Sequence, residues 1–291
     1  MRIISCDEAK SRLKDNKDTI VTVSKSSVPV LESRMLSELK GFRHGFSTRI
    51  GGVSQDIYAE MNVGLKLGDD RDSVLKNYGL LGEAIGIDCS RISAPNQVHD
   101  TVIIRAFEED AGVGIVKPGR TEGIDGQITD VKNLPLIVYG ADCVPMIFAD
   151  PVRGAVGTAH GGWKGTVNGI AQKTVEAMTK EFGSDPKDIR AAIGPSAGMC
   201  CYEVDLGVAE RFLEVFGDNG EVVRPRTEPD SEGKYMINLW EANRILLLKA
   251  GLIREHISVL GVCTICNSDM FHSHRASGGR RGLNCGIVMI G

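Results

Sequence analysis

Three residues with metal-binding side chains, His99, Cys143 and His160, lie at the borders of short apolar segments that predict β-strands. His160 is followed by Gly161–Gly162 and a helical pattern, so we expect its side chain at a sheet edge, beside unpaired helix N–H groups that favour anions. Two imidazoles and one thiolate suit zinc, and three protein ligands leave the fourth position open for water or substrate. Copper accepts the same set. A single buried Cys or His is more often a packing residue, so the prediction of a catalytic metal site rests on the shared placement of the three.

A second set of thiols is also capable of binding metal. Cys263 and Cys266 form a single CxxC motif, which is half of a structural zinc site or a redox motif. The adjacent pair Cys200–Cys201 could complete a zinc site, and plain packing is the alternative interpretation. The chain has eight cysteines and no secretory pattern, so we expect reduced thiols rather than disulfides. His272-Ser273-His274 resembles one element of a copper oxidase, but the further HxH motifs of such enzymes are absent from the sequence.

Several cationic residues are candidates for binding a phosphate or another anionic group. Lys164 lies four residues after His160, in the segment that opens the predicted helix, where its charge would add to the helix dipole. Solvated surface charge is the simpler interpretation for at least two of the arginines. The candidates are Arg49, Lys164, Arg275, Arg280 and Arg281.

Strand and helix patterns alternate around these residues and must position them. A helix with an apolar stripe from Val74 to Ile85 has Asp69–Asp70 as its N-terminal caps. The polar stretch from Asp218 to Lys234 is expected as a surface loop, with ordered elements resuming at Met236. The other predicted helices follow His160, over about 167–182, and cover 239–250, and the predicted strands are 101–105, 136–139, 144–149, 154–159, 257–262 and 286–290.

Length, composition and charge limit the class of protein. The 291 residues are 42% hydrophobic and 25% charged, which is typical of a globular protein. The net charge of -4 argues against a general nucleic-acid binder. No segment approaches the ~20 apolar residues that span a bilayer, and the early charges within Met1–Ile20 argue against a signal peptide or membrane anchor. We therefore expect a cytoplasmic enzyme without a membrane or nucleic-acid partner, and a mixed-sheet α/β or α+β fold.

Several motifs stand in a fixed order over nearly the whole chain. They are HGFSTR at 44–49, GGVS at 51–54, Asn62 with GDD at 68–70, NQVH at 96–99, Asp125-Gly126 with Thr129-Asp130, ADCVP at 141–145, AHGGWKG at 159–165, Ile193-Gly194-Pro195, CCYEV at 200–204, and 263–267 with 271–275. Together they resemble the YfiH/YlmD family, which is also called the laccase-domain or multicopper polyphenol oxidase family. The sequence departs from the family at Lys164, where arginine is usual, and at 196–199, where a cysteine is common.

The resemblance implies an α+β fold of layered mixed β-sheets flanked by helices, with residues 1–291 as a single catalytic domain. It also implies a metal, zinc or copper, held by His99, Cys143 and His160. Members are described as purine nucleoside enzymes that carry out phosphorolysis of adenosine, inosine and methylthioadenosine and deaminate adenosine. Other descriptions are a copper-dependent polyphenol oxidase and an enzyme that edits peptidoglycan precursors.

The leading hypothesis is therefore a metal-dependent purine nucleoside phosphorylase and adenosine deaminase. Zinc would lower the pKa of a bound water for attack on purine C6, and Asp142 or Glu203 would protonate the leaving amine. Cations such as Arg49 and Lys164 would orient phosphate towards C1′ of the nucleoside. The predicted catalytic residues are Cys143, His160 and Asp142, and the predicted substrate-binding residues are Arg49, Asn62, Lys164 and Arg275.

Two other classes of function fit the same residues. A cysteine hydrolase would use Cys143 as nucleophile and His160 as base, and its activity would survive removal of the metal. A non-catalytic metal or redox-sensing module would use the additional cysteines and turn over none of these substrates.

Overall fold

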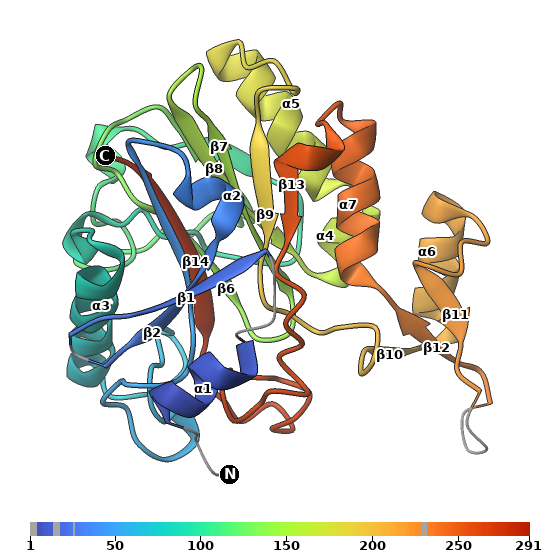
Figure 1. The fold of residues 1–291 in the computed structure, drawn as a ribbon, viewed down its shortest axis with the longest axis horizontal. Helices are drawn as coiled ribbons and strands as arrows, with labels where there is room; N and C mark the ends of the chain where they lie inside the picture. Colours follow the sequence, from blue (N-terminus) through green and yellow to red (C-terminus); the bar gives the residue numbers. More distant parts are fainter. Residues whose placement is uncertain (1–4, 14–17, 26, 228–231) are drawn as a thin grey trace.

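Two β-sheets packed face to face form the centre of the fold, which the computed structural model describes for residues 5–13, 18–25, 27–227 and 232–291 (Figure 1). The first sheet has five strands in the order β1-β2-β3-β14-β6, and its neighbouring strands are antiparallel. Its central pairings join β14 to both β3 and β6, which come from distant parts of the chain. The strands are β1 (Thr19–Val23), β2 (Pro29–Ser33), β3 (Phe42–Ser47), β6 (Leu136–Gly140) and β14 (Asn284–Ile290).

The second sheet has six strands in the order β13-β9-β7-β8-β5-β4. It is a mixed sheet, because the two outer pairs, β13 with β9 and β4 with β5, are parallel and the inner pairs are antiparallel. The strands are β4 (Ile103–Arg105), β5 (Gly126–Thr129), β7 (Val144–Asp150), β8 (Ala155–Gly161), β9 (Arg190–Ile193) and β13 (Ile257–Val259).

A smaller third sheet extends from the main body, at the right of Figure 1. It has three antiparallel strands in the order β10-β12-β11 and carries helix α6 (Leu206–Phe216). The chain enters it from β9 and leaves it into helix α7 (Leu239–Lys249). The strands are β10 (Glu203–Asp205), β11 (Val223–Pro225) and β12 (Lys234–Ile237).

Helices cover the outer faces of the two large sheets, so the layers run helix, sheet, sheet, helix. Apolar residues of α3 (Arg71–Ile85) pack on the first sheet, and those of α5 (Ile170–Phe182) and α7 pack on the second. Both faces of strand β7 are apolar because the strand lies between two layers. Met146 and Phe148 contact the helices, and Ile147 faces the first sheet. The remaining helices are α1 (Cys6–Leu13), α2 (Arg34–Ser37) and α4 (Trp163–Val167).

The layered α+β architecture agrees with the prediction, and most elements lie where the sequence patterns place them. Asp70 caps α3, accepting a hydrogen bond from the backbone N–H of Ser73 at 2.9 Å. The helix predicted after His160 is divided into α4 and α5, because Gly169 between them has φ +78°. The predicted strand 257–262 ends earlier, at Val259.

The interpretation of 218–234 as a surface loop was wrong in part. The stretch contains β11, whose residue Val223 is buried and pairs with Ile237 of β12. Strand β12 also begins at Lys234, two residues before the predicted resumption. Two apolar residues, Val222 and Val223, are enough to anchor this short strand within a polar segment. Residues 228–231 lie outside the described part of the chain.

Helix length bears on the expectation about membranes. The longest helix in the described residues is α3, with 15 residues. Within the described ranges, no helix combines the length and the apolar character that crossing a membrane requires. Residues 1–4 and 14–17, part of the N-terminal segment considered above, lie outside these ranges.

His44 of β3 makes the stability of the first sheet dependent on pH. Its imidazole Nε2 accepts a hydrogen bond from the backbone N–H of Ser33 in β2 at 2.9 Å. Burial lowers the pKa of His44 to about 4, although the nearby Glu32 carboxylate raises it. The unfolded chain therefore binds this proton at a higher pH than the native state, and the free energy of unfolding should fall as pH decreases from about 6.5 to about 4, by up to about 3 kcal/mol.

Urea unfolding across this pH range measures the effect, with His44→Gln as the matched variant, because glutamine retains an acceptor and does not titrate. The free energy of unfolding of the variant should change less between pH 6.5 and 4 than that of the wild type. Equal pH dependence in the two proteins would exclude His44 as the source.

Candidate metal centre

The structure brings His99, Cys143 and His160 together at one edge of the second sheet. The Sγ atom of Cys143 lies 3.8 Å from Nε2 of His99, and the potential ligand atoms of the three residues all lie within 4.8 Å of one another. The two imidazole rings meet edge to face, with centroids 4.8 Å apart and planes at 72°. His160 is buried, Cys143 is half-buried and His99 is exposed, so the group faces outward from the sheet.

Antiparallel pairing of β7 and β8 sets two of these positions. His160 lies opposite Pro145 near the end of β8, and Cys143 immediately precedes β7, in the turn from β6. This turn requires Asp142 to adopt φ +86°. His99 belongs to the loop before β4 and has φ +64°. Positive φ is uncommon for residues other than glycine, and it is concentrated at functional sites.

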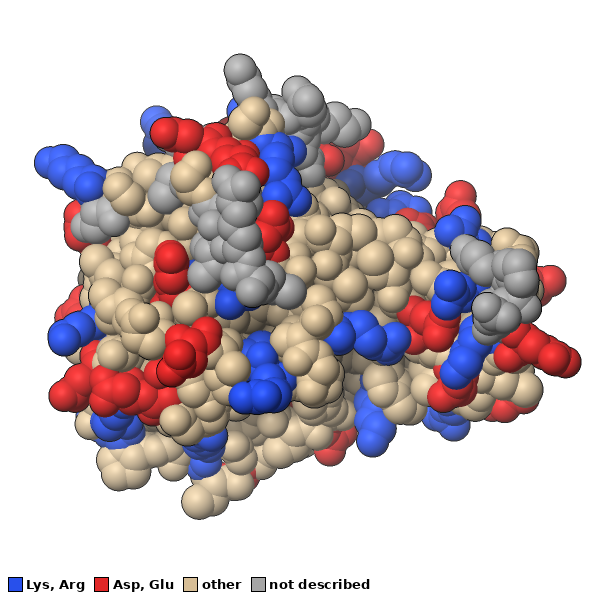
Figure 2. Space-filling view, turned by 90° about the horizontal axis from the view of Figure 1, so that it is seen from below, with Lys and Arg blue, Asp and Glu red and all other residues tan. Residues whose placement is uncertain are grey.

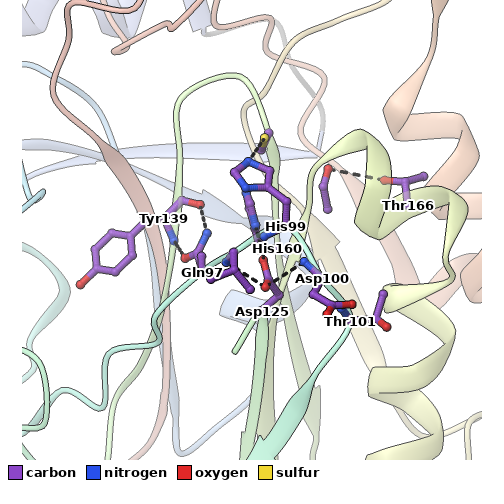
Figure 3. A network of polar contacts seen from close by, with 11 residues as sticks. Gln97, His99, Asp100, Thr101, Asp125, Tyr139, His160 and Thr166 are labelled. Atoms are coloured by element: carbon purple, nitrogen blue, oxygen red, sulfur yellow. Dashed lines mark hydrogen bonds and ion pairs between the residues drawn. The ribbon is translucent and has the colours of Figure 1, made fainter. Parts of the chain in front are cut away.

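Asp125 holds both histidines in place (Figure 3). Its buried carboxylate accepts backbone N–H bonds from Val98, His99 and Asp100 at 3.0, 2.9 and 3.0 Å. The same carboxylate lies 2.8 Å from Nδ1 of His160. A carboxylate on one ring nitrogen orients the imidazole and leaves Nε2 available to a metal, as is usual for histidine ligands. The sequence motif contains Asp125 but does not reveal this role.

Gln97 fixes the same loop to the first sheet. Its side-chain amide donates to the backbone carbonyl of Tyr139 at 3.0 Å and accepts from the backbone N–H of Tyr139 at 2.7 Å (Figure 3). The loop that carries His99 is therefore held by hydrogen bonds to β6 on one side and to Asp125 on the other.

Cys143 and His160 influence each other's ionisation. Burial by itself raises the pKa of Cys143, but the neighbouring His160 and His99 lower it to about 6. Burial lowers the pKa of His160, but Cys143 and Asp125 raise it to about 9. In the protein without metal, the pair therefore favours a thiolate beside an imidazolium at neutral pH. A thiolate is also the form of cysteine that binds a metal ion.

The space between the ligands suits a metal ion. A Cβ atom on Gly162 would lie 3.0 Å from Cδ2 of His99 and 3.2 Å from Sγ of Cys143. A side chain at position 162 would therefore crowd the three residues, and the donors that they offer are two nitrogens and one sulfur, which suit zinc and copper. The residues present therefore fit a three-ligand metal site.

The cluster forms part of the wall of a cavity of about 650 Å³. That volume is within the usual range for small-molecule sites. The wall combines apolar residues with cations, as a site for an anionic or partly polar ligand requires. Besides His99, Cys143 and His160, it includes Leu65, Lys66, Arg120, Asp142, Trp163, Tyr202, Leu239, Arg275 and Arg281.

Two predicted residues, Asp142 and Arg275, lie at this cavity and contact each other. The Asp142 carboxylate accepts from the backbone N–H of Arg275 and from Oγ1 of Thr264, both at 2.7 Å. The Arg275 guanidinium donates to the backbone carbonyl of Glu203 and lies 5.6 Å from the ring centroid of Tyr202. Asp142 therefore connects the turn after β6 to the segment that carries Arg275.

The other three predicted substrate-binding residues, Arg49, Asn62 and Lys164, are not among the residues that line this cavity. The Arg49 guanidinium donates to the backbone carbonyls of Ala59 and Ser268 and faces a separate hollow. Asn62 is buried and accepts from the backbone N–H groups of Gly64 and Leu283. These contacts favour a structural role for Arg49 and Asn62, and direct substrate binding by the three residues stays a prediction.

Arg281 and Arg120 are the two cations at the cavity that have a buried donor without a hydrogen-bond partner among the described residues. In both side chains this donor is Nε. Burial lowers the pKa of Arg281, while Asp142 and Cys143 raise it. A half-buried guanidinium with an unsatisfied donor is the arrangement that an anionic ligand would complete. Arg120 and Lys66, which sequence reasoning did not select, lie at the same wall.

A cluster of three potential metal ligands beside a cation-lined cavity suits a small-molecule site that contains a metal ion. The chain belongs to the family described as multi-copper polyphenol oxidoreductase laccase, which matches residues 43–291. It is 38% identical over 241 residues to a Bacillus subtilis protein named purine nucleoside phosphorylase YlmD, covering 82% of this chain and 84% of that protein.

Two further comparisons agree with this assignment. A prokaryotic protein named adenosine deaminase RL5 is 34% identical over 250 residues, covering 84% of this chain and 92% of that protein. The crystal structure of a Bacillus licheniformis hypothetical protein YfiH superposes with a TM-score of 0.84 at 33% identity, covering 93% of this chain and 99% of the other. The predicted family and fold are thus confirmed, and the names of the relatives support an enzyme.

Proposed function

We propose that the protein is a zinc-dependent purine nucleoside enzyme that phosphorolyses adenosine, inosine and methylthioadenosine and deaminates adenosine. The observation that carries the proposal is the placement of His99, Cys143 and His160 in the wall of a cavity that also presents Arg281. The names of the relatives, purine nucleoside phosphorylase and adenosine deaminase, agree with it.

In this proposal His99, Cys143 and His160 hold the metal. Zinc there would act as a Lewis acid and lower the pKa of water near the substrate. Asp125 keeps His160 in one orientation through the contact at Nδ1. Asp142 is assigned a positioning role, because both of its carboxylate oxygens accept hydrogen bonds from the segments that frame the cavity. Glu203, the other predicted acid, forms an ion pair with Arg226.

For phosphorolysis, Arg281 is the proposed phosphate-binding residue, and Arg275 adds positive charge beside it. A planar guanidinium binds phosphate through paired hydrogen bonds, and Arg281 has a donor free to do so. Trp163, Tyr202 and Leu239 supply apolar surface in the same cavity, which suits a purine ring.

We further propose that residues 1–291 act as one catalytic domain with small-molecule partners. The cavity is lined by segments as distant in sequence as Gly64 and Leu283. Acidic and basic residues are interspersed over the face shown in Figure 2, which is not the pattern of a phosphate-tracking surface.

The test is an assay of the purified protein, loaded with about one equivalent of zinc at this site, on adenosine with and without phosphate. We expect adenine, hypoxanthine and ribose 1-phosphate in the presence of phosphate, inosine in its absence, and ammonia in either condition. The variant Arg281→Gln should raise KM for phosphate by on the order of tenfold and affect deamination less. Absence of all these products with the zinc-loaded enzyme would refute the proposal.

A cysteine hydrolase is the second candidate, because one specific observation favours it. Asp125, His160 and Cys143 are arranged in space as a triad of carboxylate, imidazole and thiol. Asp125 lies at Nδ1 of His160, and Cys143 lies near the same imidazole. The lowered pKa of Cys143 would supply the thiolate nucleophile. This function predicts activity that survives chelation, and a peptidoglycan precursor with an amide-linked amino acid is the substrate class to assay.

A further inference from the structure

Four cysteines from two separate loops meet outside the metal cluster described above. Cys200 and Cys201 lie between β9 and β10, and Cys263 and Cys266 follow β13. The Sγ atom of Cys266 is 3.4 Å from that of Cys200 and 3.3 Å from that of Cys201. The four sulfur atoms all lie within 4.8 Å of one another. Each of the four cysteines is a free thiol.

These separations match one metal ion at the centre of four sulfurs. Zinc binds each thiolate at about 2.3 Å, which places the sulfurs of a tetrahedral site about 3.8 Å apart. Iron–sulfur clusters hold their thiolates on more than one iron atom and separate some of the sulfurs further. The distances between the four sulfur atoms are therefore those of a site that holds a single metal ion.

Backbone groups around Cys263 are arranged to stabilise a thiolate. The N–H groups of Gly198 and Cys266 point to Sγ of Cys263 at 3.3 and 3.5 Å. Four thiolates this close repel one another unless a cation lies between them, as a divalent metal would.

We propose that Cys200, Cys201, Cys263 and Cys266 form a second, structural zinc site, independent of the function proposed for the first. Four protein ligands close the coordination sphere and leave no position for substrate. The site would therefore act as a cross-link between two loops. Zinc sites of this kind contribute directly to the stability of the segments that they join.

The two loops joined by this site both reach the cavity. Tyr202 follows Cys201 directly, and the segment after Cys266 leads to His274 and Arg275, all of which line the cavity. The same two loops are also joined by backbone hydrogen bonds from the Ser196 N–H to the Val262 carbonyl at 3.2 Å and from the Thr264 N–H to the Ser196 carbonyl at 3.0 Å. A zinc ion would hold Tyr202 and Arg275 at the wall of the cavity without taking part in the reaction.

Metal analysis of the purified protein, prepared with zinc and under reducing conditions, tests the proposal. Wild type should contain about two zinc equivalents per chain, one for each site. Cys143→Ala leaves the four cysteines intact and should retain about one equivalent, whereas Cys266→Ser should lose one. Cys89→Ala is the matched control, because Cys89 is a buried free thiol outside both groups, and it should retain both equivalents.

Cobalt substitution gives a readout that does not depend on activity or on the folding of Cys266→Ser. Cys143→Ala reconstituted with cobalt should show the intense visible and near-ultraviolet bands of a tetrahedral thiolate site, and chelation should remove these bands and lower the melting temperature. Wild-type protein that holds a single zinc, lost entirely in Cys143→Ala, would overturn the proposal. Iron in place of zinc at the four cysteines, or a mass two hydrogens lower from a disulfide among them, would also overturn it.

Discussion

Replacing Cys143 with alanine is expected to remove the metal from the His99–Cys143–His160 cluster and to lower turnover of adenosine by at least about a thousandfold. The variant leaves only two nitrogen donors, and a site with two protein ligands does not hold zinc tightly. Loss of the Lewis acid removes several kcal/mol of transition-state stabilisation, and each 1.4 kcal/mol is about tenfold in rate. Metal analysis and kcat/KM for adenosine measure the two effects.

The same residue separates the two enzyme functions, so the wild type should be tested in parallel. If Cys143 is a metal ligand, chelation abolishes the wild-type activity and added zinc restores it. If Cys143 is a nucleophile, activity survives chelation and a thiol alkylator destroys it. Cys285→Ala is a suitable control for alkylation, because Cys285 is a buried free thiol in β14. Full metal content in Cys143→Ala would contradict the assignment of this cysteine as a ligand.

The second large effect is expected for Asp125→Asn. The amide has one acceptor oxygen where the carboxylate has two, and it carries no charge to stabilise the His160 imidazole. The backbone N–H groups of Val98, His99 and Asp100 then compete for fewer acceptors, and both histidines lose a fixed orientation. Metal affinity should fall by about 10- to 100-fold, as is typical when the partner of a metal-bound histidine is removed.

Competition with a chromophoric chelator measures this affinity without relying on activity. Asp130→Asn is the matched control, because Asp130 lies just after the same strand β5 and pairs with Arg105 at the surface. Its metal affinity should remain that of the wild type. Asp125→Glu should recover part of the affinity if the charge matters. Unchanged affinity in Asp125→Asn would show that the histidines are held by other contacts.

Local patterns allowed much of the fold to be predicted. Apolar runs identified β6, β7 and β8, and helical spacing with the Asp70 cap identified α3. Strand order could not be obtained in this way, because the pairing of β3 with β14 joins segments more than 200 residues apart. Such contacts depend on which apolar faces fit together in three dimensions, and the apolar pattern of a single strand does not encode its neighbour.

The candidate site could likewise be predicted from the sequence only in part. The three candidate metal ligands could be selected because the chain has only six histidines and because all three residues stand at the borders of predicted strands. The direction of a side chain is not visible in sequence, which is why Arg49 was selected although its guanidinium is hydrogen-bonded to backbone carbonyls. The positioning role of Asp125 could not be predicted, because most of its partners are backbone N–H groups of a loop. Every residue type except proline has such a group, so the sequence gives no sign of the contact.

The central position of β14 in the first sheet has a consequence for how the protein is made. A ribosome releases residues 284–290 long after β3 and β6 have been synthesised, so both strands expose an unpaired edge in the meantime. The segment with Arg275 and Arg281 precedes β14 and is therefore synthesised late as well. A nascent chain with only the earlier strands would contain His99, Cys143 and His160 without these two arginines of the cavity wall.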